Sequence, residues 1–438
     1  MHAEVIIRID GQTVATLKQE IEGSAFEQER QIERVQQRIG GVLTESGFQR
    51  IADSVAAPGC CGRPMKNCGP EEIHLHTMSG KVFLTRRRYR CRVCGQSLFP
   101  ADEAICFGGH RMTKLLAQRI CQLATVEHFT RLEQLLDDQH GIAVGHEEML
   151  ELVHQAGGAA EAARRADVES WRDRRRPAGD WPEPQFRPSR IYVSCDGIMY
   201  CTNLTEPDPE HPDQKRLIWQ QMKVGCVYWQ NAQGSWQKRV IWGRDCPEDF
   251  GATLYRLACE CGYRQAPEKI FAADGGDWCW DIQARYFSQA TRILDWYHAN
   301  EHLWETARHL ISVTADAHVW ARQAETVLWN QGGEKLTLWL REQQKSHRWR
   351  GRALEALQSL LRYFELRTEH TKYPEYRLKE WQIGSGMIES TAKQLVGLRL
   401  KGPGMHWSEK GALAITALRA QDLNGLWNTF WNNLSLSV

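Results

Sequence analysis

Three acidic residues stand where they could hold divalent cations. Asp196 comes directly after the apolar run IYVSC, Asp274 comes after EKIFAA, and Glu389 lies in GSGMIES, where a glycine-bracketed turn precedes a predicted helix. Two carboxylates at strand ends and one on a helix can converge, although they are 78 (274 − 196) and 115 (389 − 274) positions apart. Oxygen ligands suit Mg²⁺ and Mn²⁺, and a pair of such ions stabilises the attacking and leaving oxygens of phosphoryl transfer. The alternative is chance, because the chain has 54 acidic residues and Asp-Gly pairs are common turns.

A second group follows Asp274 by 21 positions (295 − 274), in the segment DWYHANEH. In one interpretation Asp295 ends a strand and holds His298, which positions the scissile phosphate or supports the site. In another, His298-x-x-Glu301-His302 is the H-x-x-E-H signature of a zinc protease, with both histidines on one helical face. A third is a pair of partly buried histidines. Nothing else in the sequence suggests a peptidase cleft.

Clustered cysteines predict a zinc site in the N-terminal part of the chain. Cys91 and Cys94, in CRVCG, have the spacing and the following glycine of one half of a zinc ribbon. The segment PGCCGRPMKNCG offers three candidates for the other half: Cys60, Cys61 and Cys68. Cys61 would act with one of the other two, and the spacing is irregular because Pro58 stands at the expected first cysteine. We expect Zn²⁺ rather than disulfides here, since cysteine clusters in a reducing compartment favour metal.

The composition is that of a folded protein with more than one domain. The chain has 438 residues, 42% of them apolar and 25% charged, which predicts two to four domains. No apolar run reaches the roughly 18 residues that span a bilayer, and the N-terminus does not resemble a signal peptide. A cytoplasmic protein with no membrane partner is therefore expected.

The order of predicted elements indicates an α/β fold. Three strands, a helix, a strand, a helix, a strand and a final helix form the order of a ribonuclease-H-like domain, and the long stretch before the last helix requires a helical insertion. We expect a hairpin and helix (1–55), a zinc-ribbon-like module (56–105), a helix-turn-helix region (110–160), a linker (161–188), the first part of the catalytic domain (189–304), the insertion (305–378), and the last catalytic helix with the tail (379–438). An ordinary helical hairpin is the alternative for the helix-turn-helix.

Basic residues are the candidates for contacts with nucleic acid. The net charge of +1 gives no indication, but basic runs can supply the affinity for phosphates. The candidates are Arg86, Arg87 and Arg88 in TRRRYRCR, the run from Arg172 to Arg176, and Lys393, Arg399, Lys401 and Trp407 beyond the predicted metal-ligand helix. A solvated surface is the alternative for each run.

Several of these segments together resemble one family. The segments VSCDG, KVGCVYW, ADGGDWCW, ILDWYHANEHLW and IGSGMIESTAKQLVGLRLKGPGMHWSEKGA resemble the ISKra group of bacterial insertion-sequence transposases, over about residues 55 to 430. The resemblance implies a DDE transposase on a ribonuclease-H-like fold, with an N-terminal zinc ribbon and helix-turn-helix. The irregular ribbon at Pro58 departs from the family pattern.

The resemblance also implies roles and partners. It implies Asp196, Asp274 and Glu389 as the catalytic triad, and Asp295-x-x-His298 looks like the C/D-x-x-H signature of Mutator-like elements. Such a protein would act on the bacterial nucleoid as a homo-oligomer, binding the terminal inverted repeats of its element and a target DNA. A domesticated protein that keeps the fold and binds DNA without cutting it is the non-enzyme alternative.

Overall fold

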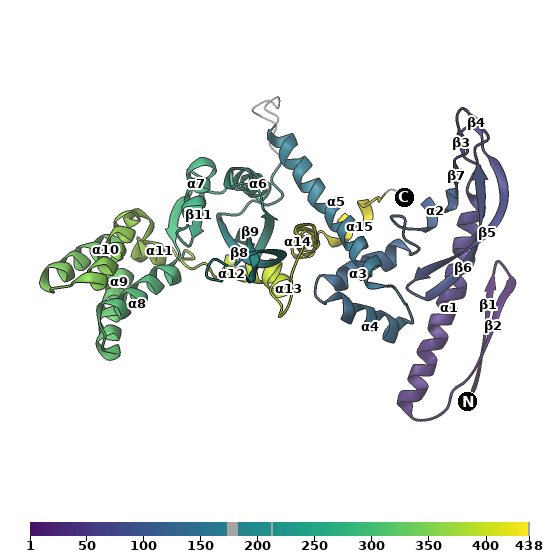
Figure 1. Ribbon diagram of the computed structural model, residues 1–438, viewed down its shortest axis with the longest axis horizontal. Coiled ribbons are helices and arrows are strands. Elements are labelled where there is room, and N and C mark those ends of the chain that lie inside the picture. The colour runs from purple at the N-terminus through teal and green to yellow at the C-terminus, as the bar shows by residue number, and fades with distance from the viewer. Residues whose placement is uncertain (173–182, 212, 437–438) are drawn as a thin grey trace. The chain divides into compact units, whose positions relative to one another are not determined.

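The computed structural model describes residues 1–172, 183–211 and 213–436 (Figure 1). The chain forms two compact units. Unit 1 comprises Met1–Ala162, Leu413–Leu418 and Trp427–Val438, and unit 2 comprises Ala163–Ala412 and Arg419–Leu426. Both contain helices and strands, which confirms the predicted α/β class at this level. No helix within the described ranges is long and apolar enough to cross a membrane.

Unit 1 begins with the expected hairpin and helix. Strands β1 (His2–Ile9) and β2 (Gln12–Glu20) pair antiparallel. Asp10 and Gly11 between them both have positive φ, 51° and 81°, as a two-residue Asp-Gly turn of this kind requires. Helix α1 (Ala25–Ser54) starts at a capping box, which fixes its first turn.

The cysteine-rich segment of unit 1 forms small sheets. Its elements are β3 (Gly59–Cys60), β4 (Arg63–Pro64), β5 (Lys66–Thr77), β6 (Gly80–Arg90), β7 (Ser97–Leu98) and α2 (Pro100–Ile105). β3 pairs with β4, and β5, β6 and β7 form an antiparallel sheet. Side chains alternate along a strand, so Leu75, Val82 and Leu84 share one face and pack with Ala52 of α1. Helix α1 thus supplies the apolar surface that this short segment lacks.

Three helices follow, as expected. They are α3 (Lys114–Ala124), α4 (Phe129–His140) and α5 (His146–Arg172). Helix α4 ends at Gly141, whose left-handed conformation caps it. Helix α5 continues to Arg172, so the first part of the predicted linker 161–188 is helical, and residues 173–182 of it lie outside the described residues. A groove-binding role for α5 stays a prediction.

The end of the chain differs from the predicted division of domains. Helix α14 (Glu409–Leu423) contributes Leu413–Leu418 to unit 1, and helix α15 (Trp427–Asn433) belongs to that unit as well. Within unit 1 the ring of Trp431 packs on Phe107, with centroids 5.6 Å apart. The segment 379–438, predicted to belong wholly to the catalytic domain, is therefore divided between the two units.

A five-stranded sheet forms the centre of unit 2. Its strands are β8 (Arg190–Pro207), β9 (Lys215–Gln230), β10 (Trp236–Gly243), β11 (Glu268–Ala273) and β12 (Thr291–Leu294). Their order in the sheet is β10-β9-β8-β11-β12. The first three pair antiparallel, and β11 is parallel to both β8 and β12. All five strands were expected from the sequence.

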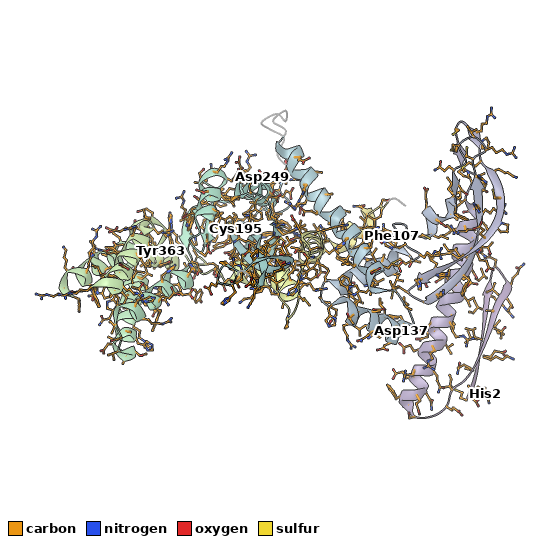
Figure 2. All side chains as sticks on the ribbon, viewed as in Figure 1. His2, Phe107, Asp137, Cys195, Asp249 and Tyr363 are labelled. Atoms are coloured by element: carbon orange, nitrogen blue, oxygen red, sulfur yellow. The ribbon has the colours of Figure 1, made fainter. Side chains whose placement is uncertain are left out.

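The two faces of this sheet carry different helices. Helices α6 (Pro247–Glu260) and α7 (Asp277–Tyr286) pack on the face that contains Val193, Cys195 and Phe271, which belong to one hydrophobic core (Figure 2 labels Cys195). Helix α12 (Gly386–Ala392) contacts β8 and β9. Since β8 residues alternate between faces, Asp196 lies on the face opposite Cys195.

The remaining elements are helical. Between β12 and α12 lie α8 (Trp296–Leu310), α9 (Thr314–Ser346), α10 (Gly351–Glu365), η1 (Thr368–His370) and α11 (Tyr373–Leu378), and the chain continues through α12 (Gly386–Ala392), a π-helical turn η2 (Lys393–Gly397) and α13 (Leu398–Leu400). Helices α8, α9 and α10 contact one another, as a separate helical insertion should. Helix α9 bends at Gly332, where φ is 81°.

Candidate active site

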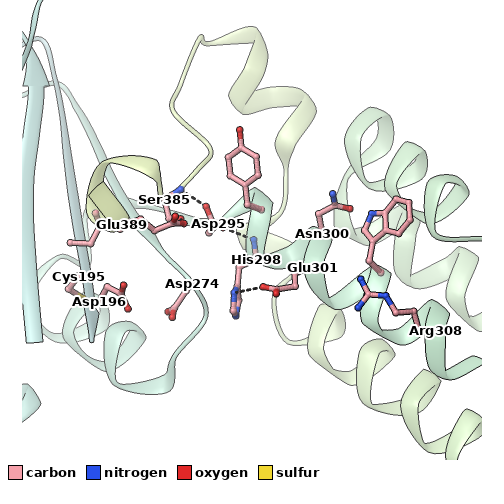
Figure 3. A pocket seen from close by; sticks show the side chains of 13 residues that line it. Cys195, Asp196, Asp274, Asp295, His298, Asn300, Glu301, Arg308, Ser385 and Glu389 are labelled. Carbon is pink, nitrogen blue, oxygen red and sulfur yellow. Dashed lines mark hydrogen bonds and ion pairs between the residues drawn. The ribbon is translucent and has the colours of Figure 1, made fainter. Parts of the chain in front are cut away.

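The three predicted acidic residues line one pocket of unit 2. The pocket has a volume of about 550 Å³ and contains the side chains of Asp196, Asp274 and Glu389 (Figure 3). Asp295, His298, Glu301 and Arg308 line it as well. Residues that are almost two hundred positions apart in the sequence therefore meet at one site.

The parallel strands β8 and β11 bring two of the carboxylates together. Their ladder ends where Ala272 pairs with Ser194, so Asp274 and Asp196 each lie two residues beyond the last pair. The carboxyl ends of parallel strands meet at one edge of a sheet, which places these side chains side by side. Each carboxylate also accepts a hydrogen bond from a nearby backbone N–H: Gly197 N to Asp196 Oδ1 at 2.6 Å, and Gly276 N to Asp274 Oδ1 at 3.1 Å.

Helix α12 supplies Glu389. The helix is held on the sheet by Ile388, which is buried, and by Thr391, whose hydroxyl lies 3.7 Å from Cys226 Sγ on β9. Ser385, the N-cap residue, donates a hydrogen bond from its hydroxyl to Glu389 Oε1. The sequence analysis missed Ser385, although serine directly before a helix is typical of an N-cap.

Asp295 connects three parts of the site. It is 1% exposed and caps α8 by accepting from His298 N at 2.6 Å, while its other oxygen accepts from Ser385 N. Its own N–H donates to Ala273 O at 2.8 Å, next to Asp274. Burial raises the pKa of Asp295, and these hydrogen bonds oppose the rise.

The structure corrects one detail of the predicted role of Asp295. It holds the backbone of His298 and not its imidazole ring. The ring Nδ1 of His298 lies 3.7 Å from Glu301 Oε2, and the side chain lines the pocket. The imidazole is therefore placed to meet a ligand of the pocket directly.

Negative charge is concentrated in this pocket. Burial, together with the charges of Asp274 and Glu389, raises the pKa of Asp196 to about 6. A cation between the carboxylates would relieve this repulsion, so the residues fit Mg²⁺ or Mn²⁺. Within the described part of the chain, only the cysteines discussed below bring three or more donor atoms within 4.8 Å of one another. The oxygens of Asp196, Asp274 and Glu389 are farther apart than the sulfur atoms of that cluster, which is compatible with two ions that lie roughly 3.5–4 Å apart.

The geometry gives no support to the zinc-protease alternative. The rings of His298 and His302 lie 4.9 Å apart, but they do not form a group of three close donors with Glu301 in the described residues. The His302 ring packs against Tyr363 at 4.4 Å, and burial lowers its pKa. His302 is thus a packing residue of the insertion.

Four cysteines of unit 1 could hold a zinc ion. The Sγ atoms of Cys60, Cys61, Cys91 and Cys94 all lie within 4.8 Å of one another. Backbone N–H groups of Cys94 and of the preceding valine lower the pKa of Cys91 to about 6, which favours the thiolate that a metal binds. Cys68, which was also predicted as a possible zinc ligand, is not part of this cluster. It is exposed, and its thiol lies 3.6 Å from the Lys66 carbonyl oxygen.

Three of the predicted DNA contacts are buried instead. Arg86 is paired with Asp102 and lies 3.6 Å over the ring of Phe99. Arg399, 2% exposed, lies over the ring of Trp407, which is itself buried. A buried side chain cannot contact a DNA backbone. The prediction is therefore wrong for Arg86, Arg399 and Trp407, which pack inside the protein instead.

Other predicted DNA contacts remain exposed. These are Arg87, Arg88, Lys393 and Lys401. Arg88 forms an ion pair with Glu71 at 3.3 Å on the surface of the β5–β6 ribbon. The side chains of the run from Arg172 to Arg176 lie outside the described residues.

Sequence comparisons found no matching family model and no matching curated protein. Among solved structures, the Drosophila P element transposase strand transfer complex aligns with 74% of this chain and 82% of its own, at 9% identity and a TM-score of 0.25. We draw no conclusion on fold or function from a likeness this low. The case for an activity therefore depends on the pocket itself.

Proposed function

We propose that this chain is a DDE transposase that cleaves DNA strands at the ends of an insertion sequence and joins them to a target. The observation that carries the proposal is the convergence of Asp196, Asp274 and Glu389 on one pocket. The pocket is lined by five carboxylates, one arginine and one histidine, so bound cations would relieve its negative charge, and hard divalent ions are the ones that oxygen ligands select.

The topology supports the same proposal. Three antiparallel strands are followed by two parallel ones, in the order β10-β9-β8-β11-β12. Asp196 lies within β8 and Asp274 directly follows β11, each two residues beyond the last pair of the β8–β11 ladder, and Glu389 lies on α12, after the helical insertion. This is the arrangement expected of the ribonuclease-H-like catalytic domain that the sequence resemblance implies.

The proposed chemistry is phosphoryl transfer without a protein nucleophile. Bound Mg²⁺ or Mn²⁺ would supply an activated attacking oxygen and neutralise the charge that develops at the phosphate. Asp196 and Asp274 would hold the ions from the sheet, and Glu389 would complete the set from α12. Asp295, through its hydrogen bonds, would hold the end of β11 and the starts of α8 and α12 together. His298 is placed to donate a hydrogen bond to a phosphate oxygen. In cleavage, a water oxygen would attack the scissile phosphorus and the P–O3′ bond would break, which leaves a 3′-hydroxyl on one side of the break and a 5′-phosphate on the other. In strand transfer, that 3′-hydroxyl would attack a phosphorus of the target DNA, whose own P–O3′ bond breaks and releases a target 3′-hydroxyl.

The partners in this proposal are DNA and further copies of the chain. Exposed cations on unit 1, among them Arg87 and Arg88, and Lys393 and Lys401 on unit 2 would bind backbone phosphates. The four-cysteine site, loaded with zinc, would stabilise the β3–β7 segment. A homo-oligomer acting on the terminal inverted repeats, in the bacterial cytoplasm at the nucleoid, is what the resemblance adds.

The test is cleavage of DNA that carries the sequences flanking the gene, by purified full-length protein with Mn²⁺. We expect strand cleavage by the wild type and its loss in Asp196→Asn, Asp274→Asn and Glu389→Gln. Asp277→Asn is the matched control, because Asp277 is exposed and only three residues from Asp274. Binding without cleavage by the wild type would favour the non-cutting alternative, and cleavage that persists in the three variants would overturn the proposal.

A further inference from the structure

A second pocket of unit 2 adjoins the carboxylates and is lined mostly by aromatic rings. Its volume is about 400 Å³, at the small end of ligand pockets, which run from roughly 300 to 1,000 Å³. The rings belong to Tyr228, Trp236, Trp296, Tyr297, Trp329 and Trp381. We call it the aromatic pocket. Tyr297 lines both pockets, so the two pockets are neighbours.

Some of these rings are structural and others are accessible. Trp296 is buried against Trp329, with centroids 4.6 Å apart, and Tyr228 is buried in the sheet. Tyr297 is 67% exposed, and Trp236 on the edge strand β10 is 37% exposed. The exposure of large apolar rings to water is unfavourable. Such exposure at the mouth of a pocket is typical of surfaces that bind a partner.

The lining of the aromatic pocket is neutral, and charged groups lie at its margin, among them the Glu268 carboxylate, which accepts from Trp381 Nε1 at 3.4 Å. No ionised side chain is among its lining residues in the described chain. Two exposed cations flank it: the guanidinium of Arg377 lies 3.9 Å from the ring centroid of Trp329, and Lys379 Nζ lies 4.5 Å from that of Trp381. The aromatic pocket, with its neutral lining and these two cations at its margin, suits a planar, uncharged group that is attached to an anionic chain.

We infer that the aromatic pocket takes one unpaired base of the DNA strand whose phosphate lies at the carboxylates. The inference rests on the proposed function, which places a DNA strand at the neighbouring pocket. Stacking on aromatic rings is worth roughly 5- to 150-fold in affinity per base, comparable with the cost of unpairing one base. The pocket therefore offsets the opening of the duplex next to the scissile phosphate.

The backbone links this pocket to catalysis. Residues 382–384 line the aromatic pocket and lead directly into Ser385, which bonds Asp295 and Glu389. Tyr297 packs so closely on Gly384 that an added Cβ would lie 2.7 Å from its ring. A base stacked on Tyr297 would hold this turn in place, and with it the carboxylate of Glu389.

The test measures DNA binding rather than cutting. Two duplexes of one sequence are compared, one fully paired and one with a single extrahelical 2-aminopurine, in an Asp274→Asn background that keeps the DNA intact. We expect the extrahelical duplex to bind roughly tenfold more tightly and its fluorescence to be quenched by stacking. Tyr297→Leu and Trp236→Leu should each lose both effects. Trp219→Leu is the control, since Trp219 is 52% exposed on β9 and outside the pocket.

The outcomes separate the two claims. Preference and quenching that persist in both aromatic variants, with melting temperatures unchanged, would overturn the inference and leave the proposed function intact. A changed oligomeric state in those variants with unchanged preference for the extrahelical base would assign the pocket to a protein contact and also overturn it. DNA cleavage by the Asp274→Asn protein would contradict the proposed function alone.

Discussion

Asp196→Asn should stabilise unit 2 at neutral pH and not in acid. Burial and two neighbouring carboxylates raise the pKa of Asp196 from 3.8 to about 6, so its ionisation opposes folding. Because the pKa of this carboxyl group is higher in the folded than in the unfolded protein, its protonation stabilises the folded state. This stabilisation is complete below about pH 4 and is lost as the pH rises through 6. The gap between 3.8 and about 6 corresponds to about 3 kcal/mol. Asparagine has a similar shape and carries no charge, so it avoids this loss.

The assay is thermal unfolding of the variant and the wild type, side by side, at a series of pH values without added divalent cations. For a domain of this size about 1 kcal/mol changes Tm by roughly 2–4 °C. We expect the Tm of Asp196→Asn, relative to the wild type, to rise by roughly 6–12 °C between pH 4 and pH 7. A difference that is the same at both pH values would refute the reasoning, because Asp196 would then have an ordinary pKa.

Divalent cations should remove this advantage. An ion that binds only the folded wild type at 100 times its Kd stabilises it by about 2.7 kcal/mol. Mg²⁺ or Mn²⁺ at pH 7 should therefore raise the Tm of the wild type and of the control Asp277→Asn, and raise that of Asp196→Asn much less. Equal stabilisation of all three proteins would place the ions elsewhere.

Three further predictions concern the supports of the two units. Asp295→Asn should lower Tm and cleavage together, because one amide oxygen cannot accept from both backbone N–H groups and an unmade buried bond costs about 1–3 kcal/mol; calorimetry and the cleavage assay check this. Cys94→Ser should reduce bound zinc, measured by elemental analysis, from about one ion per chain to a small fraction, while Cys68→Ser should retain it. Arg86→Ala should destabilise unit 1 by about 3–5 kcal/mol, because it leaves a half-buried carboxylate without its partner. Arg87→Ala should instead leave Tm unchanged and reduce the slope of log affinity against log salt by about 0.9.

The succession of strands and helices in unit 2 could be predicted, as could the candidate acidic residues, because each depends on local patterns. Short apolar runs predicted β8 and β11, and Asp274 follows the end of β11 as expected, whereas Asp196 lies within β8, which continues beyond it. The same alternation could have corrected Arg86. It follows Val82 and Leu84 at a spacing of two, so it points to the same buried face of β6. Reading the run TRRRYRCR as one basic patch ignored that period.

Other features could not be predicted because their cause lies far away in the sequence. Gly157 and Gly158 within α5 would normally weaken or end a helix. In unit 1, however, a Cβ on Gly157 would lie 2.4 Å from the backbone oxygen of Ala414, so glycine is required for close packing of α5 and α14. The adjacent thiols of Cys60 and Cys61 likewise reach one site only because Cys61 has a positive φ of 50°. Neither constraint is visible without the partner segment.

The position of Asp295 explains why a carboxylate site assembled from distant segments can be precise. Asp196 and Asp274 are fixed by one ladder of strands, but Glu389 reaches them only through α12, after the helices α8 to α11, which span residues 296–378 and contain the predicted insertion 305–378. Asp295 directly precedes these helices, and it bonds Ser385, which follows them. The insertion is thus closed by a buried, charge-assisted hydrogen bond, and movements within its helices need not displace Glu389.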